Sequence, residues 1–220
     1  KGFTLKNIRK LELESSAKIE MTEEFKVVQS NLHVMSLLSS SILTGRDLSI
    51  GVINLTMASS SSIHTDARGY STSSESGYGC EYNGQDGWAY RSRWGGAHGG
   101  KGGTGKQGSC PSGQTVYGNK DAPTTMGGGA HSVKGGGVIR LDVTGWLTMQ
   151  SQARISSDGG AAGDKAGGAG GSVWIRAAKV DLATDSVLSA RGGVGSTGSH
   201  YYRGNRYYNH AGGGGGRILL

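Results

Sequence analysis

The sequence predicts an all-β fold, a right-handed parallel β-helix, on three observations. Short apolar pairs alternate with polar residues along the chain, which is the two-residue period of a strand. In the first part of the chain these pairs recur about every 22 residues, a period typical of repeat architectures. Glycine-rich stretches interrupt the later copies, always at the same place in the repeat. Together these features favour stacked short strands over strand-helix units.

Each copy of the repeat is expected to contain three strands joined by polar bends. The first strands carry the apolar pairs Phe3 and Leu5, Phe25 and Val27, Leu48 and Ile50, Ile139 and Leu141, and Val173 and Ile175, and Ile218 and Leu220 begin a further copy. The second strands carry Leu11 and Leu13, Leu32 and Val34, Leu55 and Met57, Leu147 and Met149, and Val180 and Leu182. The third strands carry Ile19, Ile42, Ile63, Ile155 and Leu188.

Strand alternation points these apolar residues inward and the residue inside each second pair outward. The outward residues are then Glu12, His33, Thr56, Thr148 and Asp181. Three strands in about 22 residues make one rung of a solenoid, and equivalent strands of successive rungs pair about 4.8 Å apart. The sequence therefore predicts about five rungs around a continuous apolar core, with right-handed crossovers. A helix over Glu23–Leu38 is an alternative for that segment.

Glycine supplies 42 of the 220 residues, while proline occurs only twice. The inserted stretches are 67–137, 159–171 and 191–216, and each follows a third strand. Because equivalent points on successive rungs stack, all three are expected to leave the solenoid from one corner. We expect one domain over 1–220, with regular rungs in 1–66, a glycine-rich insertion in 67–137 and rungs with glycine-rich loops in 138–220. We interpret the chain as a segment of a larger or processed polypeptide.

One stretch of the long insertion has a glycine at every third residue: Gly96, Gly99, Gly102, Gly105 and Gly108. Extended helices with three residues per turn can pack side by side where side chains are missing, so we expect a lateral layer that resembles polyglycine II. A flexible linker is the alternative. A collagen strand would need proline in the triplets, and a phosphate-binding loop would need a preceding strand and a following helix.

The runs "YGNKDAPTTMGGG", "GGGVIRLDVTGWLTMQSQARISSDGG", "GGAGGSVWIRAAKV" and "GGGGGRILL" resemble the glycine-rich parallel β-helix repeats of very large secreted and cell-surface proteins, notably of protists. The resemblance covers residues 95–220, and "GGAGGSVWI" is its most specific part. It implies an extracellular structural or adhesive role and carries no catalytic residues onto this chain.

Two further motifs bear on the compartment. Cys80 and Cys110 both lie in the glycine-rich insertion, where a disulfide between them would close a polar loop; two free thiols are the alternative. Asn54-Leu55-Thr56 is the one N-x-S/T sequon, and alternation puts Asn54 and Thr56 on the outward side as a glycosylation site. We expect an extracellular or cell-surface location.

Aromatic residues interleaved with arginine form two clusters in the glycine-rich loops. They are Trp88, Tyr90, Trp94, Tyr201, Tyr202, Tyr207 and Tyr208. Flat rings beside guanidinium groups can bind glycans, and the same rings can instead pack against loop backbone or across a subunit interface.

The sequence gives little sign of other partners. The formal net charge of +7 favours acidic partners such as uronate or sulfated glycans, but the scattered cations argue against nucleic acid. No apolar run is long enough to insert in a membrane. No calcium motif or zinc spacing occurs, so we expect no cofactor or metal; calcium bound at the bases of the loops is an alternative that no motif supports.

We expect no catalytic residues and no enzyme, because neither a paired-acid arrangement nor a nucleophile motif is found; a Ser-His-Asp grouping stays open. The unpaired strands at both ends of a solenoid predict self-association. The predicted function is therefore a structural subunit of a surface fibre, stalk or matrix that stacks end to end. The alternative is a carbohydrate-binding adhesin that uses the aromatic loops, and a polysaccharide lyase or hydrolase has less support.

Overall fold

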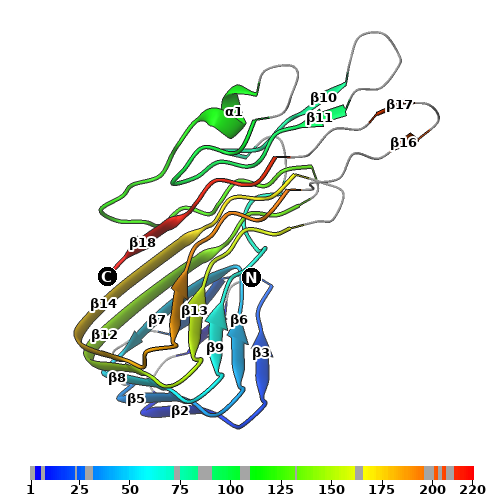
Figure 1. Ribbon diagram of the computed structural model, residues 1–220. Coiled ribbons are helices and arrows are strands. Elements are labelled where there is room, and N and C mark those ends of the chain that lie inside the picture. Colours follow the sequence, from blue (N-terminus) through cyan, green and yellow to red (C-terminus); the bar gives the residue numbers. More distant parts are fainter. Residues whose placement is uncertain are drawn as a thin grey trace.

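The computed structural model of the chain is nearly all β and contains two sheets in which every pairing is parallel (Figure 1). It describes residues 3–5, 8–22, 24–27, 32–71, 75–83, 91–104, 110–131, 133–161, 166–195, 201–202, 205–206 and 211–220. In both sheets, a strand pairs with the strand at the same place in the next copy of the repeat. This stacking is consistent with a β-solenoid.

The larger sheet has nine strands and contains the first and second strands of the repeat. Its first column is β1 (Phe3–Leu5), β4 (Glu24–Val27), β7 (Asp47–Val52), the start of β12 (Val138–Met149), the start of β14 (Ser172–Leu182) and β18 (Arg217–Leu219). Its second column is β2 (Lys10–Leu13), β5 (Val34–Leu37), β8 (Asn54–Met57) and the later halves of β12 and β14. The long strands β12 and β14 join the two columns.

The second sheet has five strands and contains the third strands of the repeat. These are β3 (Lys18–Glu20), β6 (Ile42–Thr44), β9 (Ser62–His64), β13 (Arg154–Ser156) and β15 (Val187–Ser189). They lie side by side in Figure 1, facing the first column across the core.

The observed register confirms all the predicted first strands. It corrects the predicted second and third strands in the second copy of the repeat. Phe3, Phe25 and Leu48 follow one another in one row, as expected. In the second column, however, Leu11 pairs with Met35, so the inward pair of this strand is Met35 and Leu37, and the predicted pair Leu32 and Val34 is wrong. Leu32 is still buried in the core, just before β5.

Two more assignments in the second copy change with this register. Ile19 pairs with Leu43, so Leu43 replaces Ile42 in the third strand. Glu12 pairs with Ser36, so Ser36 replaces His33 as the outward residue. The physical reason is that this segment contains two successive apolar alternations, Leu32 with Val34 and Met35 with Leu37. Only the later pair aligns with the apolar pairs of the neighbouring strands β2 and β8.

The core lies between the two sheets and consists of the inward rows of the repeat. Its largest fully buried side chains are Leu32, Met35, Leu37, Leu43, Leu48, Ile50, Leu55, Met57, Ile63, Ile139, Leu141 and Leu147. Burying each such side chain stabilises the fold by about 1.5–3 kcal/mol. Identical positions in successive copies therefore repeat the same apolar contact, which explains why the strands keep their register.

The bends between the second and third strands also repeat. Ser16, Ser40, Ser60 and Gln152 each have a φ of about 60°, the left-handed region that residues other than glycine seldom adopt. Adjacent bends are hydrogen-bonded, as from Ser40 N to Ser59 O at 3.1 Å. The polar bends predicted from the sequence thus take one conformation in four copies.

The alternative of a helix over Glu23–Leu38 is wrong for the described part of that segment, which forms β4 and β5. The four-residue helix α1 (Pro111–Gln114) was not predicted and follows Cys110 in the long insertion. Proline at its first position suits a helix start, because the missing N–H has no partner there in any case. Two antiparallel hairpins complete the secondary structure: β10 (Glu81–Asn83) with β11 (Arg91–Arg93), and β16 (Tyr201–Tyr202) with β17 (Asn205–Arg206).

The glycine-rich segments run beside one another at the end of the molecule opposite β2, β5 and β8 (Figure 1). Backbone hydrogen bonds join the three insertions: Gly96 N donates to Gly167 O, and Gly167 N donates to Ala211 O. A Cβ at Gly167 would overlap the carbonyl oxygen of Gly193. In this region the backbones approach one another more closely than any side chain would permit.

The described part of the triplet stretch shows the same close approach. A Cβ would overlap Gly128 O if added at Gly96, Gly216 O if added at Gly99, and Gly95 O if added at Gly102. Gly105 and Gly108 lie outside the described residues. The three described triplet glycines are thus packed against other backbone, which does not fit the flexible-linker alternative.

Candidate functional site at the corner where the glycine-rich segments leave the sheets

The three insertions leave the sheets at one corner, where β9, β13 and β15 end. Thr65 N donates to Ser156 O at 2.8 Å, and Ser157 N donates to Ser189 O at 2.9 Å. Two residues further, Ala67 N and Gly159 N make the corresponding bonds to Asp158 O and Arg191 O. The returning chains also stack, because Val138, Ser172 and Arg217 occupy one row. The predicted common corner is therefore present.

Two aspartates at this corner join successive copies of the repeat. Asp66 Oδ1 accepts a hydrogen bond from Asp158 N at 2.7 Å, and Oδ2 accepts one from Ser156 Oγ at 2.9 Å. One copy further, Asp158 accepts from Arg191 N at 2.7 Å and from Ser189 Oγ at 3.1 Å. Hydrogen bonds to a charged acceptor are stronger than those between neutral groups. We call Asp66 and Asp158 the aspartate ladder.

Arg154 and a buried hydroxyl row complete the ladder. Arg154 Nη2 lies 2.6 Å from Asp158 Oδ2 and 3.3 Å from Asp66 Oδ2, so one guanidinium serves both carboxylates. Deeper in the corner, Thr65 Oγ1 donates to Ser157 Oγ, which donates to Gly137 O. Each polar group in this set has a partner, so the corner is a structural junction.

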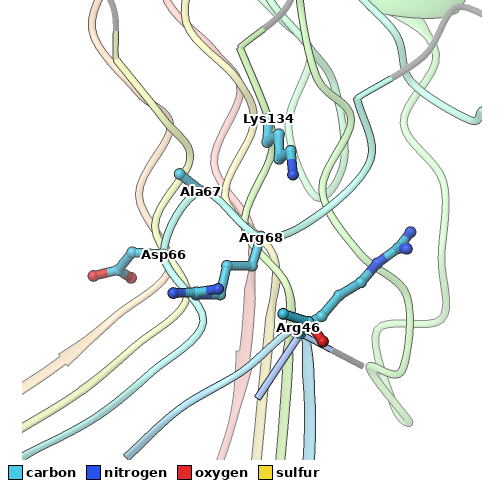
Figure 2. Close-up of a pocket in the computed structure, with 6 residues that line it drawn as sticks. Arg46, Asp66, Ala67, Arg68 and Lys134 are labelled. Atoms are coloured by element: carbon cyan, nitrogen blue, oxygen red, sulfur yellow. The ribbon is translucent and has the colours of Figure 1, made fainter. Parts of the chain in front are cut away.

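A pocket of about 360 Å³ opens beside the ladder (Figure 2). Its lining residues are Thr22, Arg46, Asp66, Ala67, Arg68 and Lys134. Arg68 pairs with Glu20, and Arg46 lies 3.6 Å from Glu75. Hydrogen bonds from Lys18 and Arg68 lower the pKa of Glu20 to about 2. Most of the positive charge is therefore neutralised locally.

His64, Asp66 and Ser156 bring the three residue types of a Ser-His-Asp grouping together at this corner. His64 Nδ1 lies 3.7 Å from Asp66 Oδ2, too far for a hydrogen bond, and this buried nitrogen has no other partner. Burial lowers the pKa of His64, and the Asp66 charge opposes that shift. Ser156 Oγ donates directly to Asp66, so no histidine is placed to accept its proton. The geometry does not suit nucleophilic catalysis.

His98 connects two of the insertions. Its Nδ1 lies 2.8 Å from Gly170 O and its Nε2 lies 2.8 Å from Thr125 Oγ1. Because a carbonyl can only accept, Nδ1 carries the proton and Nε2 accepts from the hydroxyl. Burial lowers the pKa of His98 to about 4, so the ring is neutral at pH 7.

The cysteines and one of the predicted aromatic residues can be placed. Cys80 and Cys110 form a disulfide with a Cα–Cα distance of 5.5 Å, so the free-thiol alternative is wrong. The bond is consistent with an oxidising compartment. Trp94 is only 9% exposed, which suits packing rather than glycan contact.

The remaining members of the aromatic clusters cannot be brought together. Tyr201 and Tyr202 form β16, for which the backbone alone is described. Trp88, Tyr90, Tyr207 and Tyr208 lie outside the described residues.

Two tryptophans on the outer face of the larger sheet were not among the predicted site residues. Lys179 Nζ lies 4.8 Å from the ring centre of Trp146, and the Arg176 guanidinium lies 5.4 Å from that of Trp174. Trp146 is 48% exposed. The alternation of apolar and polar residues along β12 and β14 places both tryptophans on the outward side, so the sequence could have indicated that their rings lie on this face.

In comparisons with known proteins, no family model, curated protein or solved structure matches this chain. The resemblance to glycine-rich surface repeats stays a prediction. Across the described residues, no helix is long and apolar enough to cross a bilayer. The same part of the chain contains no group of three histidine, cysteine, aspartate or glutamate residues placed to bind a metal.

Proposed function

We propose that this chain is an extracellular structural protein, a right-handed β-solenoid of about five rungs that stacks end to end. A lateral layer resembling polyglycine II flanks the rungs. The observation that carries the proposal is the uncovered end of the apolar core. Val180 and Leu182 are 38% and 39% exposed, whereas Leu147 and Met149, one copy earlier, are almost fully buried. Among the described residues, this last rung of the core therefore has no neighbour that covers it.

Backbone pairing also stops at both ends. Among the described strands, β2 and β3 pair only with β5 and β6, and β15 pairs only with β13. Unpaired edges with apolar side chains behind them are templates for further strands. A second copy offers matching rows, because Leu11 and Leu13 occupy the same rows as Val180 and Leu182.

The first column sets the geometry of such a stack. Among the described strands, this column contains six, from β1 to β18, whereas each of the other two columns contains five. If β18 of one copy takes the place of β1 of the next, beside β4, all three columns continue without a gap. The rung at the junction would then combine β18 of one copy with β2 and β3 of its neighbour.

Charge in the outward rows works against this junction and makes it testable. Stacking would place Lys10 beside Lys179 and Glu12 beside Asp181, and like charges directly opposite one another are destabilising. The Lys10–Glu12 pair at 2.9 Å moderates the repulsion within β2. Assembly should therefore increase when salt screens these charges.

The test is a charge-swap cycle read by sedimentation and electron microscopy over a wide range of concentrations. Lys10→Glu with Glu12→Lys should promote stacking, because both rows become complementary without a change in net charge. Lys179→Asp with Asp181→Lys should do the same, and the two swaps together should restore wild-type behaviour. If every variant stays monomeric, or if all assemble equally, the end-to-end stack is wrong.

A further inference from the structure

An exposed apolar patch lies on the outer face of the larger sheet, away from the glycine-rich segments. Its members are Ile53 at 37% exposure and Trp146 at 48%. They lie where β7 passes into β8 and where β12 bends toward its second half, at the opposite end from β10 and β16 (Figure 1). Asn54 of the sequon directly follows Ile53, and its Oδ1 accepts a hydrogen bond from Trp146 N at 3.0 Å. Leaving the Trp146 ring half exposed forgoes the burial that such a ring normally provides.

The Asn54 amide is oriented by a bulge in the neighbouring strand. The register of β12 shifts between Val143 and Trp146, and Asn54 Oδ1 accepts a hydrogen bond from Trp146 N at 3.0 Å. Gly145 makes room for this oxygen, since a Cβ there would crowd Asn54 Oδ1. The carbonyl oxygen thus faces β12, and Asn54 Nδ2 makes no hydrogen bond to any described residue.

That free nitrogen is the atom that N-linked glycosylation modifies. The modification replaces one Nδ2 hydrogen and leaves Oδ1 able to accept from Trp146 N, so the bulge and a glycan are compatible. Thr56, the third residue of the sequon, lies two residues along β8 and is part-exposed on the same side. The compartment fits as well, because the Cys80–Cys110 disulfide is typical of secreted chains.

The patch provides a surface on which the first sugar can pack. Trp146 directly precedes Leu147, which pairs with Leu55 of β8, and Lys179 Nζ lies 4.8 Å from the centre of the Trp146 ring. The ammonium group contacts one part of the half-exposed indole, and the backbone N–H of the same residue donates to the Asn54 amide. A pyranose ring has an apolar face of C–H groups that would cover Ile53 and Trp146 and remove their apolar area from water.

We propose that Asn54 carries an N-linked glycan whose first sugar packs on Trp146 and Ile53. In the reaction, a bond forms between Asn54 Nδ2 and the anomeric carbon of the donor sugar. The bond from that carbon to a phosphate oxygen of a lipid-diphosphate oligosaccharide breaks, the lipid diphosphate leaves with the electron pair, and the amide loses one proton. The glycan then covers the apolar patch in the folded protein.

The acceptor is tested by secreting the full chain from a eukaryotic cell and measuring the mass of the peptide that contains Asn54. The wild type and Thr56→Ser, which keeps the sequon, should carry a glycan that a peptide N-glycosidase removes. Thr56→Ala and Asn54→Gln should carry none. A secreted wild-type chain with unmodified Asn54 would overturn the proposal.

The packing is tested by comparing glycosylated chain with the same chain made in a host that does not glycosylate. The glycan should raise Tm by about 2–4 °C, the shift expected for a modest stabilisation of a chain of this size. Trp146→Ala should remove most of that difference. Trp174→Ala, which removes another outward ring beside a cation, should leave it intact. An equal glycan effect on Tm in both variants would show that the sugar does not pack on Trp146.

Discussion

The sheets and the glycine-rich segments solve the same stacking problem by opposite means. In the sheets, Leu55, Leu147 and their equivalents fill the space between backbones with apolar side chains. In the glycine-rich segments, chains such as those at Gly96 and Gly167 approach so closely that no side chain fits, and backbone hydrogen bonds join them. Removing atoms should therefore damage the first region, and adding atoms should damage the second.

The largest expected loss of stability comes from removing a core side chain in the sheets, and it is compared with adding a methyl group in the glycine-rich region. Leu147→Ala leaves a cavity in the core and should lower the free energy of unfolding by about 2–5 kcal/mol. Gly167→Ala adds one methyl that overlaps the Gly193 carbonyl, and it should cost about 1–3 kcal/mol, as overpacking does. Urea unfolding measures both.

Gly215→Ala is the matched control for the glycine variant, because a Cβ at Gly215 meets nothing within 4 Å. This variant should be neutral. A Gly167→Ala chain as stable as Gly215→Ala would mean that the close approach of the glycine-rich backbones is not a real constraint.

The disulfide tests whether the glycine-rich region needs a covalent link that the sheets do not. Cys80 and Cys110 are 30 residues apart, and opening that loop should lower the free energy of unfolding by up to about 3–4 kcal/mol through chain entropy. The Cys80→Ser, Cys110→Ser double variant should lose hydrogen-exchange protection in residues 95–104 while β7, β8 and β12 keep theirs. Equal loss of protection in both regions would show that the two unfold together.

Acid should also destabilise the glycine-rich region through His98. The folded-state pKa of His98 is about 4, below its ordinary 6.5, so the unfolded chain binds a proton first as pH falls. The stabilisation is complete above pH 6.5 and is lost between pH 6.5 and 4, to a total of up to about 3 kcal/mol. Unfolding measured across this window should show a weaker pH dependence in His98→Gln. An unchanged pH profile in that variant would exclude His98 as the source.

The smallest expected effect concerns the corner between the two regions. Asp158→Ala removes the acceptor for Arg191 N, Ser189 Oγ and Arg154, and it should cost about 1–2 kcal/mol, because these bonds are part-exposed. Asp121→Ala is the control, since its pair with Lys120 is on the surface and contributes little. Thermal unfolding that ranks the two variants equally would show that the aspartate ladder does not join the copies.

Most of the sheet architecture could be predicted because alternation repeats in the chain. The first strands follow directly from pairs such as Phe25 and Val27. The second copy was misplaced by three residues, because Leu32 and Val34 alternate as well as Met35 and Leu37 do. A constant interval would have resolved it: in every copy of the observed register, the third-strand apolar residue follows the second pair by the same number of residues.

The corner could be predicted only in outline. The place where the insertions leave follows from the repeat, but the aspartate ladder joins Asp66 to Asp158 across 92 residues and depends on the side-chain geometry of both. The bulge at Gly145 likewise depends on β8, where Asn54 supplies the missing acceptor. Neither contact leaves a periodic trace in the sequence.

The common corner also has a consequence for folding kinetics and for tolerance of chain length. Leu55 pairs on one side with Met35, which lies 20 residues earlier in the chain. On the other side it pairs with Leu147, which lies 92 residues later, the same separation as between Thr65 and Ser157 at the corner. Loop-closure entropy grows only with the logarithm of length, so the longer closure costs just about 1 kcal/mol more. Contact order rises much more steeply, which should make docking of β12 on β7 and β8 a late step. Insertions at this corner should thus lower the stability of the fold only slightly but slow its folding.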